Sequence, residues 1–325
     1  MKNLPILLKR EYWEHRGGFL WTPVWVTGGV LILTVLGMIA AEIFRARAQV
    51  QLGGFSLDAV RASISAHDYA NAGRAFDISQ VMLGVVPCIA LFFVLFFYLL
   101  GALYDDRRDR SVLFWKSLPV SDAATVVSKA ASAMLVAPLI ALLISTLAYL
   151  VFVVIVGIWF ALHGLNVLPA LMAAHPLRTF WHMLLTVPLD ALWALPAIGW
   201  LLFWSAWSRS KPFLWAVMLP LLVIFANAWI GMLGGPSFGS TKQVAHVTGR
   251  LLLSVMPGSW LTSDISVAGD SWQAALRSEG SPSILDPSRM AAVLTSAELW
   301  IGVVVGAALI AAAIWARGRR IETSV

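Results

Sequence analysis

Charged residues and cysteines are both scarce in this chain. Only 12% of its 325 residues are Asp, Glu, Lys or Arg, about half the share found in an average soluble domain. The single cysteine, Cys88, excludes an intrachain disulfide and a cysteine metal site. The six histidines are scattered, and His175 and His182, seven residues apart, make only a weak metal pair. The composition therefore argues against a soluble, disulfide-linked or metal-bound domain.

Common nucleotide-binding and hydrolytic motifs are missing as well. The sequence contains no G-x-x-x-x-G-K-[ST] phosphate loop, no H-E-x-x-H zinc motif and no G-x-S-x-G nucleophile motif. We therefore expect a chain that is not itself an enzyme. We also expect it to lack catalytic, metal-binding and cofactor-binding residues of its own.

Long apolar runs dominate the sequence instead, and hydrophobic residues make up 59% of it. The six runs are Phe19–Ala41, Ile78–Tyr104, Ala130–Leu162, Phe180–Ser208, Pro212–Leu233 and Leu299–Ala316. About 20 apolar residues in a helix match a hydrocarbon core of roughly 30 Å. The runs are continuous rather than alternating, which favours helices over a barrel. The sequence thus predicts an all-α polytopic membrane protein with six transmembrane helices.

The basic residues between these runs indicate the orientation. Lys and Arg are about three times denser in one set of segments than in the other. The dense set is 1–18, 104–129, 209–211 and 317–325, and the sparse set is 42–77, 163–179 and 234–298. The positive-inside rule then places both termini in the cytoplasm. The net charge of +6 accordingly indicates topology and contact with membrane lipid, and no nucleic acid is expected as a partner.

The first 18 residues form a separate unit ahead of a single domain, 19–325. Leu4, Leu7, Leu8 and Tyr12 share one side of a helix, with basic residues around them. This pattern predicts an interfacial helix on the cytoplasmic surface. A simple topology anchor is the alternative interpretation.

Residues 104–121 combine charge and apolar side chains in a cytoplasmic elbow between spans two and three. Six charged residues, 105–110, precede an apolar patch, Val112–Trp115. Ser121 is a suitable N-cap for a helix that continues as the third span, with a kink at Pro138. Apolar anchors rimmed by charge are typical of a protein-binding hot spot. Insertion of Phe114 and Trp115 into the lipid interface remains the alternative.

Two further features lie in the second half of the chain. The external loop 234–298 contains Leu251–Met256, which is too short to span and is typical of a re-entrant or interfacial segment. One face of span four carries the carboxylate Asp190 with Trp193, Trp200 and Trp204. We take this face as a candidate cavity for an amphiphilic or cationic ligand. In the alternative, these side chains pack against neighbouring helices.

Two stretches, LLKREYWEHRGGFLWTP (7–23) and LYDDRRDRSVLFWKSLPVS (103–121), carry a resemblance to a known family. The chain resembles the permease subunit of bacterial type-2 ATP-binding-cassette (ABC) exporters. The first stretch is similar to the family's connecting helix, and the second to the segment after span two.

The resemblance implies a location in the bacterial cytoplasmic (inner) membrane. It implies a pathway formed with a second permease copy or a paralogue. A separate cytosolic ABC ATPase dimer would carry ATP and Mg. The resemblance assigns ATPase contact to Arg107, Arg108, Arg110, Phe114, Trp115 and Leu118. It also implies that the 234–298 loop is an external gate.

Other functions remain open at this stage. An ion-coupled secondary transporter would need several intramembrane carboxylates or paired broken helices, whereas only Asp190 lies well inside a span. A lipid-modifying membrane enzyme would need a His/Asp/Ser cluster near the interface. A membrane assembly or regulatory protein without transport is compatible with the sequence. The transported substrate is left open.

Overall fold

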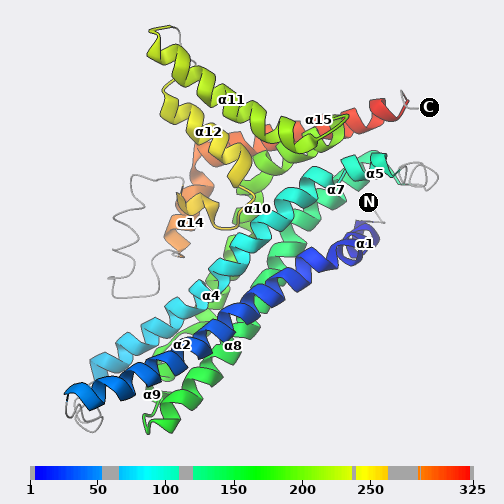
Figure 1. The fold of residues 1–325 in the computed structure, drawn as a ribbon. Coiled ribbons are helices and arrows are strands. Elements are labelled where there is room, and N and C mark those ends of the chain that lie inside the picture. The colour runs from blue at the N-terminus through cyan, green and yellow to red at the C-terminus, as the bar shows by residue number, and fades with distance from the viewer. Residues whose placement is uncertain are drawn as a thin grey trace.

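The chain folds into a bundle of long helices (Figure 1). The computed structural model describes residues 4–52, 66–109, 120–235, 239–262, 285 and 287–322. Within these ranges the secondary structure is entirely helical. Six helical stretches are long and apolar enough to cross a membrane: 4–44, 68–108, 122–162, 176–207, 212–232 and 297–319. The predicted all-α, six-span, multi-pass architecture is therefore confirmed.

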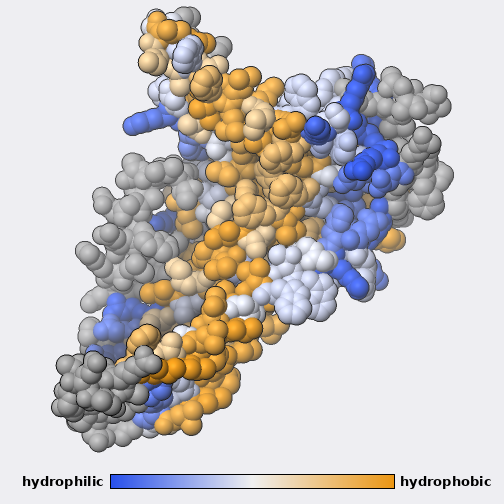
Figure 2. All heavy atoms as spheres, viewed as in Figure 1, coloured by the Kyte–Doolittle hydropathy of each residue, from blue (hydrophilic) through white to orange (hydrophobic). Residues whose placement is uncertain are grey.

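The two chain ends lie at the same end of the bundle, which we call the terminal end (Figure 1). The opposite end, where α2 finishes and α9 (Leu168–Ala173) lies, is the far end. Apolar side chains cover the middle of the face shown in Figure 2, and hydrophilic ones gather at the terminal end. This distribution fits helices that cross a lipid layer.

The first span begins with a bend. Helix α1 (Leu4–Arg16) is kinked one residue before its end, at His15, whose φ of −114° and ψ of 19° are not helical. A π-helical turn, η1 (Gly17–Trp21), then leads into α2 (Thr22–Leu52). A helix is present where the interfacial helix is predicted, and its Leu7 and Glu11 are buried against the bundle. It therefore packs on protein, and its place on the membrane surface stays a prediction.

The second span, α4 (Ala66–Gly101), starts well before its apolar run, and α2 continues well past the end of the first run. The predicted polar loop 42–77 is consequently too long. Hydropathy detects the apolar part of a helix, whereas polar residues such as Asn71 and Asp77 continue the same helix before its apolar run. A possible short helix near Leu57–Ala66 lies almost entirely outside the described residues.

The third span is continuous over α7 (Asp122–Ala131), the π-helical turn η2 (Ser132–Val136) and α8 (Ala137–Leu162). The Ser121 hydroxyl accepts a hydrogen bond from the amide of Ala124 at 3.2 Å, so the predicted N-cap is confirmed. The irregularity near Pro138 takes the form of the π turn just before it.

Helix α10 (Pro176–Trp207) makes its most extensive contact with α15 (Ala297–Glu322). Glycines allow this closeness. A methyl group on Gly199 would lie 2.6 Å from the carbonyl oxygen of Gly306, and one on Gly306 would lie 2.5 Å from the backbone of Leu195. Small residues at such crossings let helix backbones approach in lipid, where packing drives association.

The segment after α11 (Pro212–Met232) returns into the bundle. Helix α12 (Thr241–Leu253), which begins with a Ser240–Gln243 capping box, packs against α11 and α10. The chain then turns, and Val255 is buried in the same core as Leu95 and Ile198. A short 3-10 helix, η3 (Ser259–Thr262), follows, and α14 (Pro287–Thr295) precedes α15. The apolar stretch Leu251–Met256 thus packs into the bundle, as a re-entrant segment would, and we call residues 241–262 the re-entrant segment.

Candidate functional site

A connected group of charged side chains lies inside the terminal end of the bundle. It joins the first helix, the short helix α5 (Tyr104–Arg108) after span two, the start of the third span and the end of the last helix. We call it the terminal ion network, and its members are Glu11, Asp106, Asp122, Lys129 and Arg317.

Lys129 is at the centre of one half of this network. Its ammonium lies 3.3 Å from a Glu11 oxygen and 3.6 Å from an Asp106 oxygen, and its side chain is only 3% exposed. Glu11 is 1% exposed and also accepts a hydrogen bond of 2.9 Å from the Tyr98 hydroxyl. The connecting helix α1 is thereby tied to spans two and three.

Arg317 forms the other half. Its Nη1 lies 3.1 Å from Asp106, and its Nε lies 3.0 Å from Asp122. The Arg317 side chain is 3% exposed and that of Asp106 is 13% exposed, whereas that of Asp122 is 32% exposed, so the pair with Asp106 is the better shielded from water. Asp106 is the shared member, because its carboxylate forms ion pairs with both Lys129 and Arg317.

The network is buried at a high desolvation cost, which only its alternating charges compensate. Removing one member of such a group leaves a charge without its partner and is strongly destabilising, whereas the intact group fixes the relative positions of its elements. Asp106 and Asp122 stand on either side of the segment 110–119. The network therefore holds both flanks of that segment against α1 and α15.

Two of the predicted ATPase-contact residues lie beside this network. Arg107 points inward, and its guanidinium donates to the carbonyl oxygens of Ser205 at 2.6 Å and Ser208 at 3.1 Å. The Ser205 hydroxyl in turn accepts from the amides of Leu103 and Tyr104. Arg108 is exposed. Hence Arg107 ties the end of span two to the end of α10, while Arg108 is accessible.

The other four predicted contact residues, Arg110, Phe114, Trp115 and Leu118, lie outside the described residues. Their assignment to ATPase contact stays a prediction. The described flanks of the segment nevertheless show that its two ends are anchored to three helices, α7, α10 and α15.

Sequence reasoning did not assemble the terminal ion network, although one signal was present. Glu11 falls on the same helix side as Leu4, Leu7 and Leu8, and a carboxylate on an apolar face requires a buried partner. Lys129 directly precedes an apolar run, which is a similar signal. Pairing them with each other and with Asp106 and Arg317 required the tertiary arrangement, since Glu11 lies more than a hundred positions from Lys129, and Arg317 lies 211 positions from Asp106.

A second polar cluster lies near the middle of α10 and involves the predicted cavity residue Asp190. Asp190 is 9% exposed, and its Oδ1 accepts a hydrogen bond of 2.7 Å from the amide of Gly258. Gly258 has a φ of +80°, which favours glycine at this turn. Asp190 thus holds the turn of the re-entrant segment against α10.

The ring of Trp193, the next predicted cavity residue, is covered by the guanidinium group of Arg250, a cation of the protein itself. The Arg250 guanidinium lies 4.0 Å from the centroid of the Trp193 ring. Arg250 Nη1 also donates to the Glu298 carboxylate at 2.9 Å and to its backbone carbonyl at 2.7 Å. A methyl group on Gly302 would lie 2.3 Å from Arg250, so this glycine makes room for the guanidinium.

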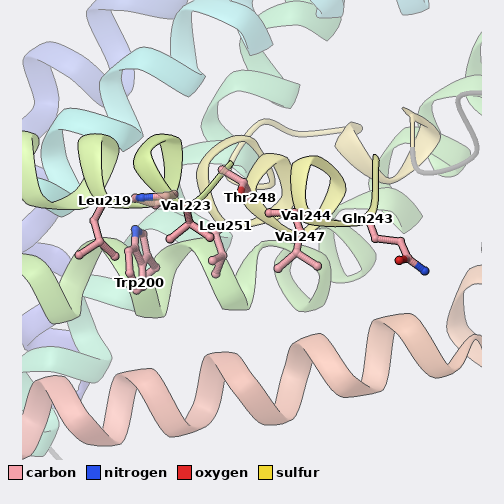
Figure 3. A pocket seen from close by; sticks show the side chains of 9 residues that line it. Trp200, Leu219, Val223, Gln243, Val244, Val247, Thr248 and Leu251 are labelled. Atoms are coloured by element: carbon pink, nitrogen blue, oxygen red, sulfur yellow. The ribbon is translucent and has the colours of Figure 1, made fainter. Parts of the chain in front are cut away.

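Trp200 and Trp204 belong to a different neighbourhood from Trp193. The two rings are 5.6 Å apart, and Trp204 stacks on Trp215 of α11 at 5.8 Å. Trp200 lines an apolar hollow of about 280 Å³ between α10, α11 and α12 (Figure 3). Gln243 and Leu219 stand toward opposite ends of this hollow.

The four predicted cavity residues are therefore not lining one space. Asp190 and Trp193 bind groups of the chain's own re-entrant segment, whereas Trp200 opens onto a hollow beside it. A substrate role for this face stays a prediction, and Trp200 is its best-placed member. In the part of the chain that the structure describes, no group of three His, Cys, Asp or Glu side chains could hold a metal ion.

Comparison with known proteins adds no relatives: no family model, no curated protein and no solved structure matches this chain.

Proposed function

We propose that this chain is the permease subunit of a bacterial ABC exporter in the cytoplasmic membrane. The terminal ion network is the observation that supports this proposal best. It connects both flanks of the 110–119 segment to the first, third and last spans through buried charges. Such an arrangement suits a surface that receives force from a partner and passes it to the membrane helices.

Other features support the same function. These 325 residues contain no phosphate loop, which is compatible with a motor on a separate chain. Residues 7–23 and 103–121 carry the family resemblance, and both contribute members of the network. The proposed partner is a cytosolic ATPase dimer that holds ATP and Mg. A second permease copy or a paralogue would complete the pathway.

In the proposed mechanism, ATP-driven closure of the partner displaces the 104–121 elbow. Asp106 and Lys129 pass this displacement to Glu11 on α1, while Asp106 and Arg317 pass it to α15. Because α15 and α10 are packed through Gly199 and Gly306, α10 moves with α15. ATP thus biases the bundle between inward-facing and outward-facing states.

Replacement of the apolar elbow residues tests the proposal. We expect Trp115→Ala with Leu118→Ala to remove most of an ATPase that copurifies with the tagged chain, because apolar anchors dominate such interfaces. The matched control is Leu177→Ala with Trp181→Ala, an exposed Leu–Trp pair at the far end of α10. Quantitative mass spectrometry measures the captured ATPase. Equal capture by both double variants would contradict the assignment of the elbow.

An ion-coupled carrier is the second candidate, and the burial of Asp190 at membrane depth favours it. A carrier would work without any ATPase partner. If the chain is such a carrier, liposomes that contain only this chain should transport substrate when an ion gradient is applied. A permease subunit without its ATPase should not, so this measurement distinguishes the two proposals.

A further inference from the structure

A column of stacked aromatic rings joins the end of α10 to the terminal-end part of α15 (Figure 1). The ring centroids of Phe203 and Trp207 lie 6.0 Å apart, and those of Trp207 and Trp315 lie 6.2 Å apart. The planes of the two tryptophan rings are 8° from parallel. The Arg319 guanidinium lies 4.6 Å from the centroid of the Trp315 ring. The column therefore ends in a cation that the face of an aromatic ring holds in place.

Two more basic side chains follow this column along the chain. Trp207 is the last residue of α10, and Arg209 and Lys211 come two and four residues after it. Four residues of chain span at most about 14 Å, so both residues lie close to the column. Arg209, Lys211 and Arg319 are all exposed. The end of the column is therefore surrounded by three accessible cations.

Acidic residues are scarce in the two segments that carry these cations. Segments 208–212 and 318–325 hold four basic residues and one acidic residue, Glu322. Within the part of the chain that the structure describes, no carboxylate pairs with any of the three exposed cations. The surface around the column thus carries an excess of positive charge.

Exposed apolar faces of two helices lead to these cations. On α15, the face that ends in Arg319 consists of residues three or four positions apart: Ile301, Val304, Ala308, Ala311 and Trp315. On α11, the face that begins at Lys211 continues with Trp215, Met218, Leu222 and Phe225. Such faces suit the hydrocarbon of a membrane, and a tryptophan at the end of a span suits the headgroup region. Arg319 lies about 6 Å beyond Trp315 along the helix, at the depth of the lipid phosphates.

We propose that the surface formed by Arg209, Lys211, Trp315 and Arg319 binds the headgroup of an anionic phospholipid from the leaflet at the terminal end. The Arg319 guanidinium, oriented by Trp315, donates parallel hydrogen bonds to the lipid phosphate. Arg209 and Lys211 add attraction for a net negative headgroup and repel the cationic group of a zwitterionic lipid. The acyl chains lie along the exposed apolar faces. This site requires a membrane but no ATPase, so it is independent of the proposed function.

Phosphatidylglycerol is the probe for this site. The chain is purified in nanodiscs that contain equal parts of phosphatidylglycerol, phosphatidylethanolamine and phosphatidylcholine, and the lipids that it retains are counted by native mass spectrometry. We expect phosphatidylglycerol to be enriched in the wild type. Arg319→Gln should reduce that enrichment by about fivefold, the usual contribution of one basic residue near an anionic surface. Trp315→Leu keeps every charge but removes the ring that orients Arg319, and it should reduce the enrichment by about twofold.

The chain offers a matched control in Arg289→Gln. Arg289 is an exposed arginine on α14, so its replacement removes the same charge elsewhere, and we expect it to retain lipid as the wild type does. An equal loss in Arg289→Gln and Arg319→Gln would show general attraction to anionic lipid and overturn the proposal. Equal retention of the three lipids by the wild type would overturn it as well. A protein partner is the competing occupant: if Arg319→Gln loses a captured ATPase but keeps its lipid, the surface belongs to that partner and the proposal is wrong.

Discussion

At the scale of single residues, buried charge is the most consequential feature of this molecule. Lys129 compensates two carboxylates at once, and Asp106 is shared between Lys129 and Arg317. Asp190, by contrast, has a backbone amide as its partner. These two environments lead to different expectations for substitution.

Replacement of Lys129 by methionine removes the charge but keeps an apolar stem. We expect Lys129→Met to lower the free energy of unfolding by about 3–5 kcal/mol, because Glu11 and Asp106 lose their buried partner. Thermal unfolding in detergent measures the effect.

The control for Lys129 is Arg10→Met, which breaks the exposed Arg10–Glu14 pair on the same helix as Glu11. That change should cost about 1 kcal/mol or less. Adding Glu11→Gln to Lys129→Met should recover part of the loss. Similar destabilisation by the two single variants would refute the importance of burial.

The contact between Asp190 and the Gly258 amide can be tested by comparing replacement of Asp190 by asparagine with its replacement by alanine. Asn keeps an oxygen that accepts from the Gly258 amide, whereas Ala leaves that amide unpaired at a cost of about 1–3 kcal/mol. We expect faster hydrogen exchange across 254–262 in Asp190→Ala and nearly wild-type exchange in Asp190→Asn. If exchange is unchanged in Asp190→Ala, the anchoring role is wrong. Loss of transport in Asp190→Asn would support the predicted substrate role instead.

At the scale of helices, the sequence predicted which membrane-spanning helices exist but not where each of them begins and ends. The six apolar runs predicted the six spans because lipid requires long continuous apolar helices. They did not predict that α4 begins at Ala66, since its first turns are polar and lie outside the apolar run. Likewise, Leu251–Met256 predicted a re-entrant segment, while its anchors Asp190 and Arg250 became visible only in the fold.

The contact between α10 and α15 provides a prediction about helix packing. A methyl group on Gly306 would lie 2.5 Å from the backbone of Leu195, so Gly306→Ala must separate the helices. We expect a loss of about 1–3 kcal/mol in the free energy of unfolding, as for other overpacked contacts. In Gly37→Ala the new methyl group would meet nothing within 4 Å. That control should change stability by about 1 kcal/mol at most, and equal effects would exclude close packing as the cause.

At the scale of the whole molecule, the terminal end and the region around the middle of α10 are held together differently. The terminal end is held by charges that connect α1, α5, α7 and α15. Around the middle of α10, the re-entrant segment is bound to α10 and α15. Helices α10 and α15 reach both regions, so they are the natural route by which one region would influence the other.

The most direct test of this account is capture of the tagged chain from its native membranes in mild detergent, with and without ATP, followed by mass spectrometry. The account predicts a cytosolic protein with a phosphate loop, present in equal number with this chain and dependent on an intact elbow. Absence of any such ATPase under both conditions would contradict the permease proposal, and an ion-coupled carrier or an assembly protein would then be the better interpretation.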